Sequence, residues 1–213
     1  MIQLDTPTKA TATSGGSITF NATIPARTKF LIVTGSFRYT GDNAYNPVAT
    51  AGGVSMTKRV DKDGYRSHLC IFTLAAPATG TVSIVVNPQG DSGDFSSGLA
   101  VAYPCFNVDA YEAADSETGT ATSASVGVTA SQGGSLLIDA YVNAGATVGD
   151  VGAGQTAINN SAVNSRAQMS SYKIVTSGAQ TMSVSGYSNE VYIYGCVLIK
   201  AKPMGGSFML NML

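Results

Sequence analysis

Charged residues are scarce in this chain of 213 residues. Twelve Lys and Arg oppose 13 Asp and Glu, and together they make up 12% of the sequence. Nucleic-acid binding that is independent of base sequence relies on clustered Lys and Arg, and anionic lipid attracts the same residues. Because the formal net charge is −1, we expect neither nucleic acid nor a membrane surface as a partner.

The chain also lacks a long apolar run. No stretch approaches the roughly 20 apolar residues that a membrane-spanning helix requires. The opening segment, MIQLDTPTKATATSGG, does not contain the apolar core of a signal peptide. We therefore expect a protein that is made and folded in a cytoplasm.

Tryptophan is absent, and cysteine and histidine are rare. Cys70, Cys105 and Cys196 are odd in number, widely spaced and flanked by apolar residues, so we expect buried free thiols and no disulfide framework. The single histidine, His68, alternates with Arg66 and Cys70 in a strand-like segment, which predicts a half-exposed strand residue.

Catalytic signatures are missing as well. The sequence contains no G-x-S-x-G, P-loop, H-E-x-x-H or C-x-x-C motif. A nucleophile that needs a neutral base would depend on His68 alone. We therefore predict a protein that is not an enzyme and binds no cofactor.

The residues that are abundant favour strands and tight turns. Gly occurs 24 times, and Ser and Thr make up about a fifth of the chain, above ordinary usage. Residues 18–24 alternate apolar and polar side chains, and residues 29–37 form a run of apolar and β-branched residues typical of a buried strand. Further strand-like runs follow, separated by turn residues, with residues 39–53 predicted as a surface loop. These patterns predict an all-β protein.

The second half of the chain repeats features of the first. Residues 65–74 align without gaps onto 165–174, 81–84 onto 181–184, 29–32 onto 135–138, and 103–105 onto 194–196. Two related half-units are what a jelly-roll β-sandwich of two antiparallel sheets would show. We predict that neither half closes a sandwich alone, so the chain is one domain.

The predicted domain organisation has three parts. Residues 1–16 form an N-terminal arm, and residues 17–202 form the single jelly-roll domain. Within it, half-units of about 17–106 and 124–200 are joined by an acidic connector at 107–123. Residues 203–213 form an apolar C-terminal tail, which soluble proteins rarely leave exposed. The tail and arm are candidate interfaces, packed either on this chain or on a neighbouring subunit. The candidate interface residues are Phe208, Met209, Leu210, Met212, Leu213, Ile2 and Leu4.

Two other groups of residues are candidate ligand sites. Asp61 and Asp63, and Asp91 and Asp94, stand in Gly-containing turns; such carboxylates suit Ca²⁺, although hairpin turns use the same residues. Four tyrosines in or near predicted loops could stack on sugars or contact proteins. They are Tyr39, Tyr45, Tyr111 and Tyr187.

The order of motifs resembles a Gly/Ser/Thr-rich jelly-roll domain of tailed-phage structural proteins and of bacterial proteins of phage origin. The matching segments are SITFNATIP at 17–25, FLIV at 30–33, GGVSMTK at 52–58, GTVSIVV at 80–86, GLAVAY at 98–103 and GAGQT at 152–156. The resemblance covers residues 17–200. That family often has a Trp before the strand in its second half, where this chain has Tyr172.

The resemblance implies a virion protein that decorates or cements a capsid, or builds a head or tail projection, through contacts between subunits. Its partners would be capsid or tail proteins of the same particle. A homo-oligomer is expected, and the resemblance favours a trimer. The alternative hypothesis is a carbohydrate-binding module of a phage spike or adhesin that contacts host glycans, through the tyrosines and Ca²⁺.

Overall fold

A computed structural model describes residues 1–39, 46–89 and 95–203. These residues form strands and no helix, so no helix among them could cross a bilayer. The strands are β1 (Gln3–Leu4), β2 (Thr8–Ala12), β3 (Ile18–Ile24), β4 (Phe30–Tyr39), β5 (Val48–Ala51), β6 (Val54–Ser55), β7 (Thr57–Gly64), β8 (Ser67–Ala75), β9 (Gly80–Asn87), β10 (Phe95–Phe106), β11 (Val108–Ala130), β12 (Ser135–Asn143), β13 (Asp150–Val151), β14 (Thr156–Val163), β15 (Arg166–Val175) and β16 (Gly178–Ala201).

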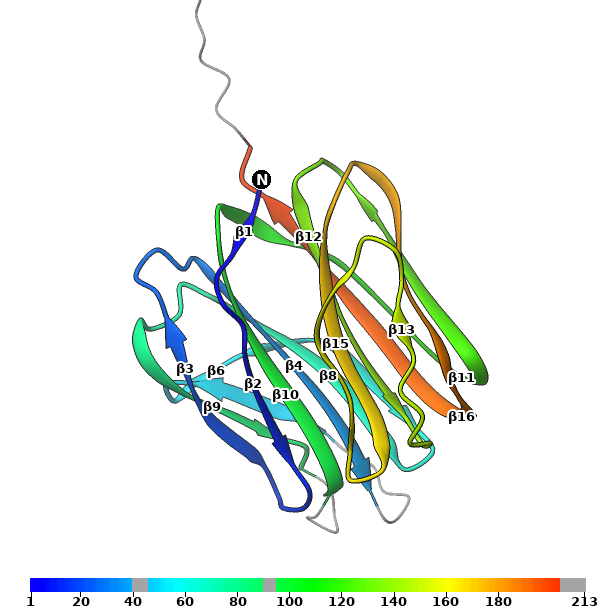
Figure 1. Cartoon of the computed structure of the whole chain (residues 1–213). Helices are drawn as coiled ribbons and strands as arrows, with labels where there is room; N and C mark the ends of the chain where they lie inside the picture. The colour runs from blue at the N-terminus through cyan, green and yellow to red at the C-terminus, as the bar shows by residue number, and fades with distance from the viewer. Residues whose placement is uncertain (40–45, 90–94, 204–213) are drawn as a thin grey trace, which may run out of the picture.

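The strands pair into three antiparallel sheets. One has the order β1-β10-β4-β8-β7, with β2 also pairing with β10, and a second has the order β3-β9-β5-β6. The third has the order β11-β16-β12-β15-β14, with β13 pairing with β16. Figure 1 shows the first two sheets on one side of the molecule and the third on the other.

Each half of the chain is a long hairpin rolled across two layers. In the first roll, residues 3–106, β2 pairs with β10, β3 with β9 and β4 with β8. In the second roll, residues 108–201, the two parts of β11 pair with the two parts of β16 in reverse order, and β12 pairs with β15. Nested pairing of early strands with late ones is the jelly-roll arrangement.

The long strands β11 and β16 each serve both layers of the second roll. Their pairing shifts register between Ala121 and Ser123, where a β-bulge bends the ribbon. Beyond the bend, Val126 and Val184 pack with Leu137 of β12 and Met169 of β15 in one core. The end of the ribbon therefore covers the outer face of its own sheet.

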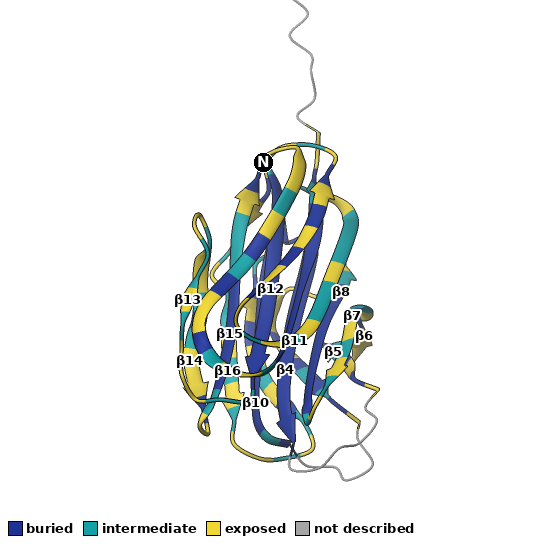
Figure 2. Cartoon of the chain, turned by 90° about the vertical axis from the view of Figure 1, so that its right-hand side faces the viewer, coloured by how far each residue is buried: buried dark blue, intermediate teal, exposed yellow. Residues whose placement is uncertain are grey.

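Three apolar cores hold the layers together. The core of the first roll contains Leu31 and Phe72, and that of the second contains Leu137 and Leu198. A third core lies between the rolls. Its buried members include Ile32, Leu69, Ile71, Val101, Ile138, Ile193 and Val197. Strands β4 and β12 are buried on both faces, which Figure 2 shows as continuous dark blue.

The structure confirms an all-β fold of stacked antiparallel sheets, but the described residues form three sheets where the sequence predicted two. The reason is that the two rolls pack against each other around a further core, so the protein has more layers than a single sandwich of two sheets. Residues 107–123, predicted as a connector, contain the first part of β11. The predicted surface loop at 39–53 contains β5, which pairs with β9.

Candidate functional site

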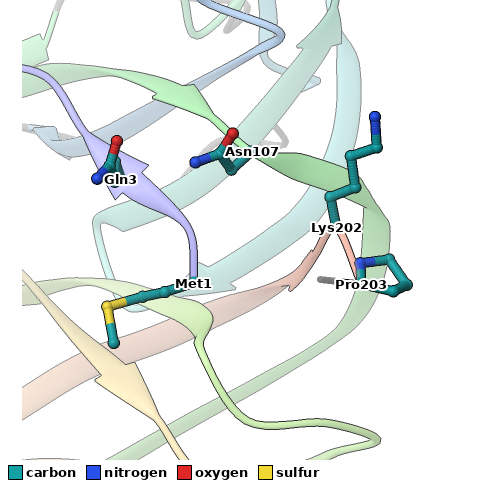
Figure 3. A pocket seen from close by; sticks show the side chains of 5 residues that line it. All are labelled: Met1, Gln3, Asn107, Lys202 and Pro203. Atoms are coloured by element: carbon teal, nitrogen blue, oxygen red, sulfur yellow. The ribbon is translucent and has the colours of Figure 1, made fainter. Parts of the chain in front are cut away.

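Both ends of the described chain lie at one pole of the molecule. Five residues line a shallow pocket there: Met1, Gln3, Asn107, Lys202 and Pro203 (Figure 3). The amide of Ile2 donates to the carbonyl of Gly134 at 2.8 Å, and the amide of Lys202 donates to the carbonyl of Asn107 at 2.8 Å. Gly134 has a φ of +77°, and a Cβ there would lie 2.9 Å from the Cα of Met1. Because glycine has no Cβ, the backbone of Met1 can lie this close to residue 134.

A second hollow, which we call the terminal groove, adjoins this pocket. Its walls come from β1 and the residue before it, the end of β10, β15 and the turn after β3, and they are Ile2, Gln3, Leu4, Arg27, Phe106, Tyr172 and Ile174. Ile174 is 39% exposed. The Arg27 guanidinium lies 4.3 Å from the centre of the Phe106 ring. Its Nε donates to Asp5 at 3.2 Å, and this hydrogen bond raises the pKa of Arg27. The groove is thus mainly apolar, with a cation at its rim.

Of the predicted interface residues, only two lie in the described part. Ile2 is 1% exposed and belongs to the core between the rolls, so it packs on its own chain, which is one of the two arrangements considered for the arm. The reason is that β1 pairs with β10 and draws Ile2 inward. Leu4 is half-buried in the terminal groove. Phe208, Met209, Leu210, Met212 and Leu213 lie outside the described residues.

His68 joins two of the predicted calcium ligands. Its Nε2 lies 2.7 Å from Oδ1 of Asp61, and its Nδ1 contacts Oδ1 of Asp63. His68 is fully buried, so the prediction of a half-exposed residue was wrong. β8 is an interior strand, and the carboxylates of the neighbouring strand β7 cover the imidazole. Because both ring nitrogens face carboxylates, neither is placed to act as a base on a substrate.

The aspartates show no cation cage in the described residues. Asp61 also contacts the ammonium of Lys58. In the parts of the chain that the structure describes, no group of three or more His, Cys, Asp or Glu is arranged to hold a metal ion. Asp91 and Asp94 lie outside those parts.

Removing divalent cations tests the calcium hypothesis directly. Since Asp61 and Asp63 are paired with His68, we expect the Tm in excess EDTA to match the Tm in millimolar CaCl₂. Differential scanning calorimetry measures both. A rise in Tm with Ca²⁺ that Asp61→Asn abolishes would instead establish a site at β7.

The predicted ligand-binding tyrosines do not form one surface. Tyr39 is the last residue of β4 and Tyr187 lies within β16, and each is 3% exposed, so both side chains are buried. The Tyr187 ring lies 4.3 Å from that of Tyr141, and its hydroxyl donates to Asn160 at 3.0 Å. Tyr111 is half-buried on β11, with the Arg59 guanidinium 4.1 Å from its ring centre. Tyr45 lies outside the described residues.

A buried carboxylate that the sequence reasoning missed lies inside the second roll. Asp139 of β12 accepts hydrogen bonds from the Tyr194 hydroxyl at 2.6 Å, from the amide and hydroxyl of Ser171 at 2.7 Å each, and from Gln155 at 3.1 Å. Burial raises its pKa to about 6, although the hydrogen bonds from Tyr194 and Ser171 oppose the shift. The available signal was one acid within the apolar run SLLIDAYV. Asp139 links three strands and a loop and is closed to solvent.

Three acidic residues in the first part of β11 accept hydrogen bonds from backbone amides farther along the chain. Glu112, Asp115 and Glu117 accept hydrogen bonds from the amides of residues 131, 127 and 125, at 2.8, 2.8 and 2.9 Å. Those amides belong to the part of the ribbon beyond the bend and to the turn that follows. An exposed strand edge invites pairing with another chain. The three carboxylates therefore occupy the backbone amides of residues 125, 127 and 131 with charge-assisted hydrogen bonds, so these amides are not available to pair with another strand.

The thiols are also closed to chemistry. Cys70, Cys105 and Cys196 are free and buried, as predicted. Burial raises the pKa of each thiol well above its ordinary value. Because the thiolate is the reactive form, none of these cysteines is positioned as a nucleophile.

Fold and pole together define an all-β protein of stacked antiparallel sheets with a surface groove beside both ends of the described chain. No family model and no curated protein matches the chain. Three solved structures show weak likeness. The ANX2 ectodomain from Arabidopsis thaliana is 9% identical, with 94% of this chain and 90% of that chain covered and a TM-score of 0.28. The major capsid protein P2 of bacteriophage PM2 is 7% identical, covered at 93% and 100%, with a TM-score of 0.27. A Red Clover Necrotic Mosaic Virus structure is 14% identical, covered at 87% and 84%, with a TM-score of 0.23.

Proposed function

We propose that the chain is a non-enzymatic structural subunit of a phage or phage-like particle, which decorates or cements the capsid or forms a head or tail projection. Its activity would be contact between subunits. The observation that carries the proposal is the pole, where the last described residue, Pro203, lies beside the N-terminal strand, next to an apolar groove. The segment that follows Pro203 is itself apolar.

The absence of accessible chemistry in the described residues supports a structural role. The imidazole of His68 lies between two carboxylates, the three thiols are buried, and Asp139 is enclosed. A body with three apolar cores is rigid, because close-packed interiors resist deformation. A rigid subunit with an apolar segment that contacts its neighbours suits assembly through repeated contacts.

The carbohydrate-binding alternative has less support. Sugar binding relies on exposed aromatic faces, and Tyr39 and Tyr187 are buried in cores. Tyr65 is 52% exposed, but guanidinium groups of Arg38 and Arg66 lie over its ring at 5.6 and 5.0 Å. Retention on a glycan array that Tyr65→Ala abolishes would favour this alternative.

Light scattering tests the proposed function. We expect the full chain to form a defined oligomer and a chain ending at Pro203 to be a monomer with the same circular dichroism spectrum, because residues 1–203 contain all three described cores. The measurement is the molar mass of each across a hundredfold range of concentration. A full chain that stays monomeric throughout would contradict assembly through self-association.

A further inference from the structure

The terminal groove is an apolar surface without a described partner, located where the chain leaves its last strand. Leu4, Phe106 and Tyr172 are half-buried, and Ile174 is 39% exposed. The groove joins edges of both rolls, since Leu4 and Phe106 come from the first and Tyr172 and Ile174 from the second. Apolar surface gathered in this way marks a contact site more often than isolated exposed residues do.

The segment after Pro203 has the composition and the reach to fill the groove. Residues 208–213 read FMLNML, and Gly205 and Gly206 precede them. Gln3 lines both the groove and the pocket that contains Pro203, so the last described residue lies beside the groove. Ten residues in extended form span up to roughly 33 Å, at the rise per residue of an extended chain.

The direction of β16 favours a second copy as the source of the segment. β16 runs toward the pole, where Ala201 pairs with Val108 and Lys202 bonds to Asn107. From Gln3, which it shares with the pocket at the pole, the groove continues to Leu4, the next residue of β1. To enter its own groove, the chain would have to reverse directly after Pro203. In two copies that meet pole to pole about a twofold axis, a segment that kept the direction of β16 would lead toward the facing groove.

We propose that the terminal groove binds residues 208–213 of a second copy of this chain, and that two copies exchange these segments reciprocally. This inference rests on the proposed function, since it names the surface through which subunits associate. In a twofold arrangement the contact between groove and segment forms twice. This doubles the buried area and brings it closer to the roughly 1,600 Å² typical of specific interfaces. The net charge of −1 imposes little repulsion between copies. A dimer is the expected unit, in place of the trimer that the sequence resemblance favoured.

Two substitutions in the full chain separate the groove from the segment. Ile174→Glu places a charge in the groove, and Leu210→Glu places one in the segment. Each substitution is present in both copies of a homodimer and so disrupts both contacts between groove and segment. We therefore expect each to raise the dimer Kd at least tenfold in sedimentation velocity. The matched control is Val54→Glu, because Val54 is 53% exposed on β6, outside the groove. Its Kd should stay within twofold of the parent value.

Mixing the two variants gives the decisive result. The Ile174→Glu chain has an intact segment and the Leu210→Glu chain has an intact groove. A dimer of the two variants therefore contains one intact contact between groove and segment. We expect a heterodimer that neither variant forms alone, detected with a fluorescent label on one of them. An oligomer that survives both substitutions but is lost on truncation at Pro203 would overturn this inference and leave the proposed function standing. A monomeric parent chain, or a mixture that stays monomeric, would overturn it as well.

Discussion

Raising the pH from about 4 to 7 is expected to remove most of the roughly 3 kcal/mol that one side chain, Asp139, contributes to the unfolding free energy, at 1.36 kcal/mol per unit of pKa shift. Its pKa is about 6 in the folded chain against 3.8 for the unconstrained group. A folded-state pKa above the unfolded value means that the folded state binds more protons between these values. The contribution of Asp139 is therefore fully present below about pH 4 and is lost as the pH rises through 6.

Substitution by asparagine isolates this effect. Asp139→Asn keeps the shape of the side chain but does not titrate, so the unfolding free energy should lose its slope between pH 4 and 7. Urea unfolding at half-unit pH intervals measures it. Asp150→Asn is the control, because Asp150 is exposed on β13 and should retain the parent slope. A parent chain whose stability rises across this window, or an asparagine variant with an unchanged slope, would contradict the assignment to Asp139.

Asp139 and His68 show where sequence reasoning fails for single polar residues. Both stand in strands, and period-two alternation gives the face that each side chain occupies. Alternation does not show whether that face is covered by another layer. β8 and β12 each lie between two cores, so both faces of these strands are buried and polar residues on them need partners from other strands. For Asp139 those partners are Ser171 and Tyr194.

The internal alignment illustrates the same difficulty at the level of register. Leu31 and Leu137, which the alignment equates, face the interiors of their own rolls. The gapless alignment of 65–74 with 165–174 equates Leu69 with Met169, yet Leu69 faces the core between the rolls and Met169 the core of the second roll. A shift of one residue reverses every side chain of a strand. Sequence similarity among small apolar residues is too uniform to fix the register to one residue.

The terminal groove could not be predicted from local pattern either. Its walls come from residues near positions 4, 27, 106 and 173, which lie together only because β1 pairs with the end of β10 and the second roll packs against the first. By contrast, the apolar segment at 208–213 is evident from composition alone. The sequence therefore identified one component of the candidate contact, and the topology supplies the surface it would meet.

Truncating Ile193 is expected to lower the unfolding free energy by about 2–5 kcal/mol, the usual range for Ile→Ala in a core. Ile193 of β16 is fully buried in the core between the rolls. It packs tightly against the first roll, since a Cβ on Gly64 of β7 would lie 2.8 Å from its Cγ1. Ile193→Ala leaves a cavity at the junction that neither roll can close without moving away from the other.

The shape of the transition carries more information than its midpoint. Because both rolls contribute to the core that holds Ile193, we expect Ile193→Ala to unfold in a single transition by circular dichroism and by tyrosine fluorescence, with both probes shifted equally. Val148→Ala is the control, since Val148 is 38% exposed and should cost under about 0.5 kcal/mol. Two separated transitions in the variant would show that each roll is stable without the other. That result would make the core between the rolls an interface between independent folding units.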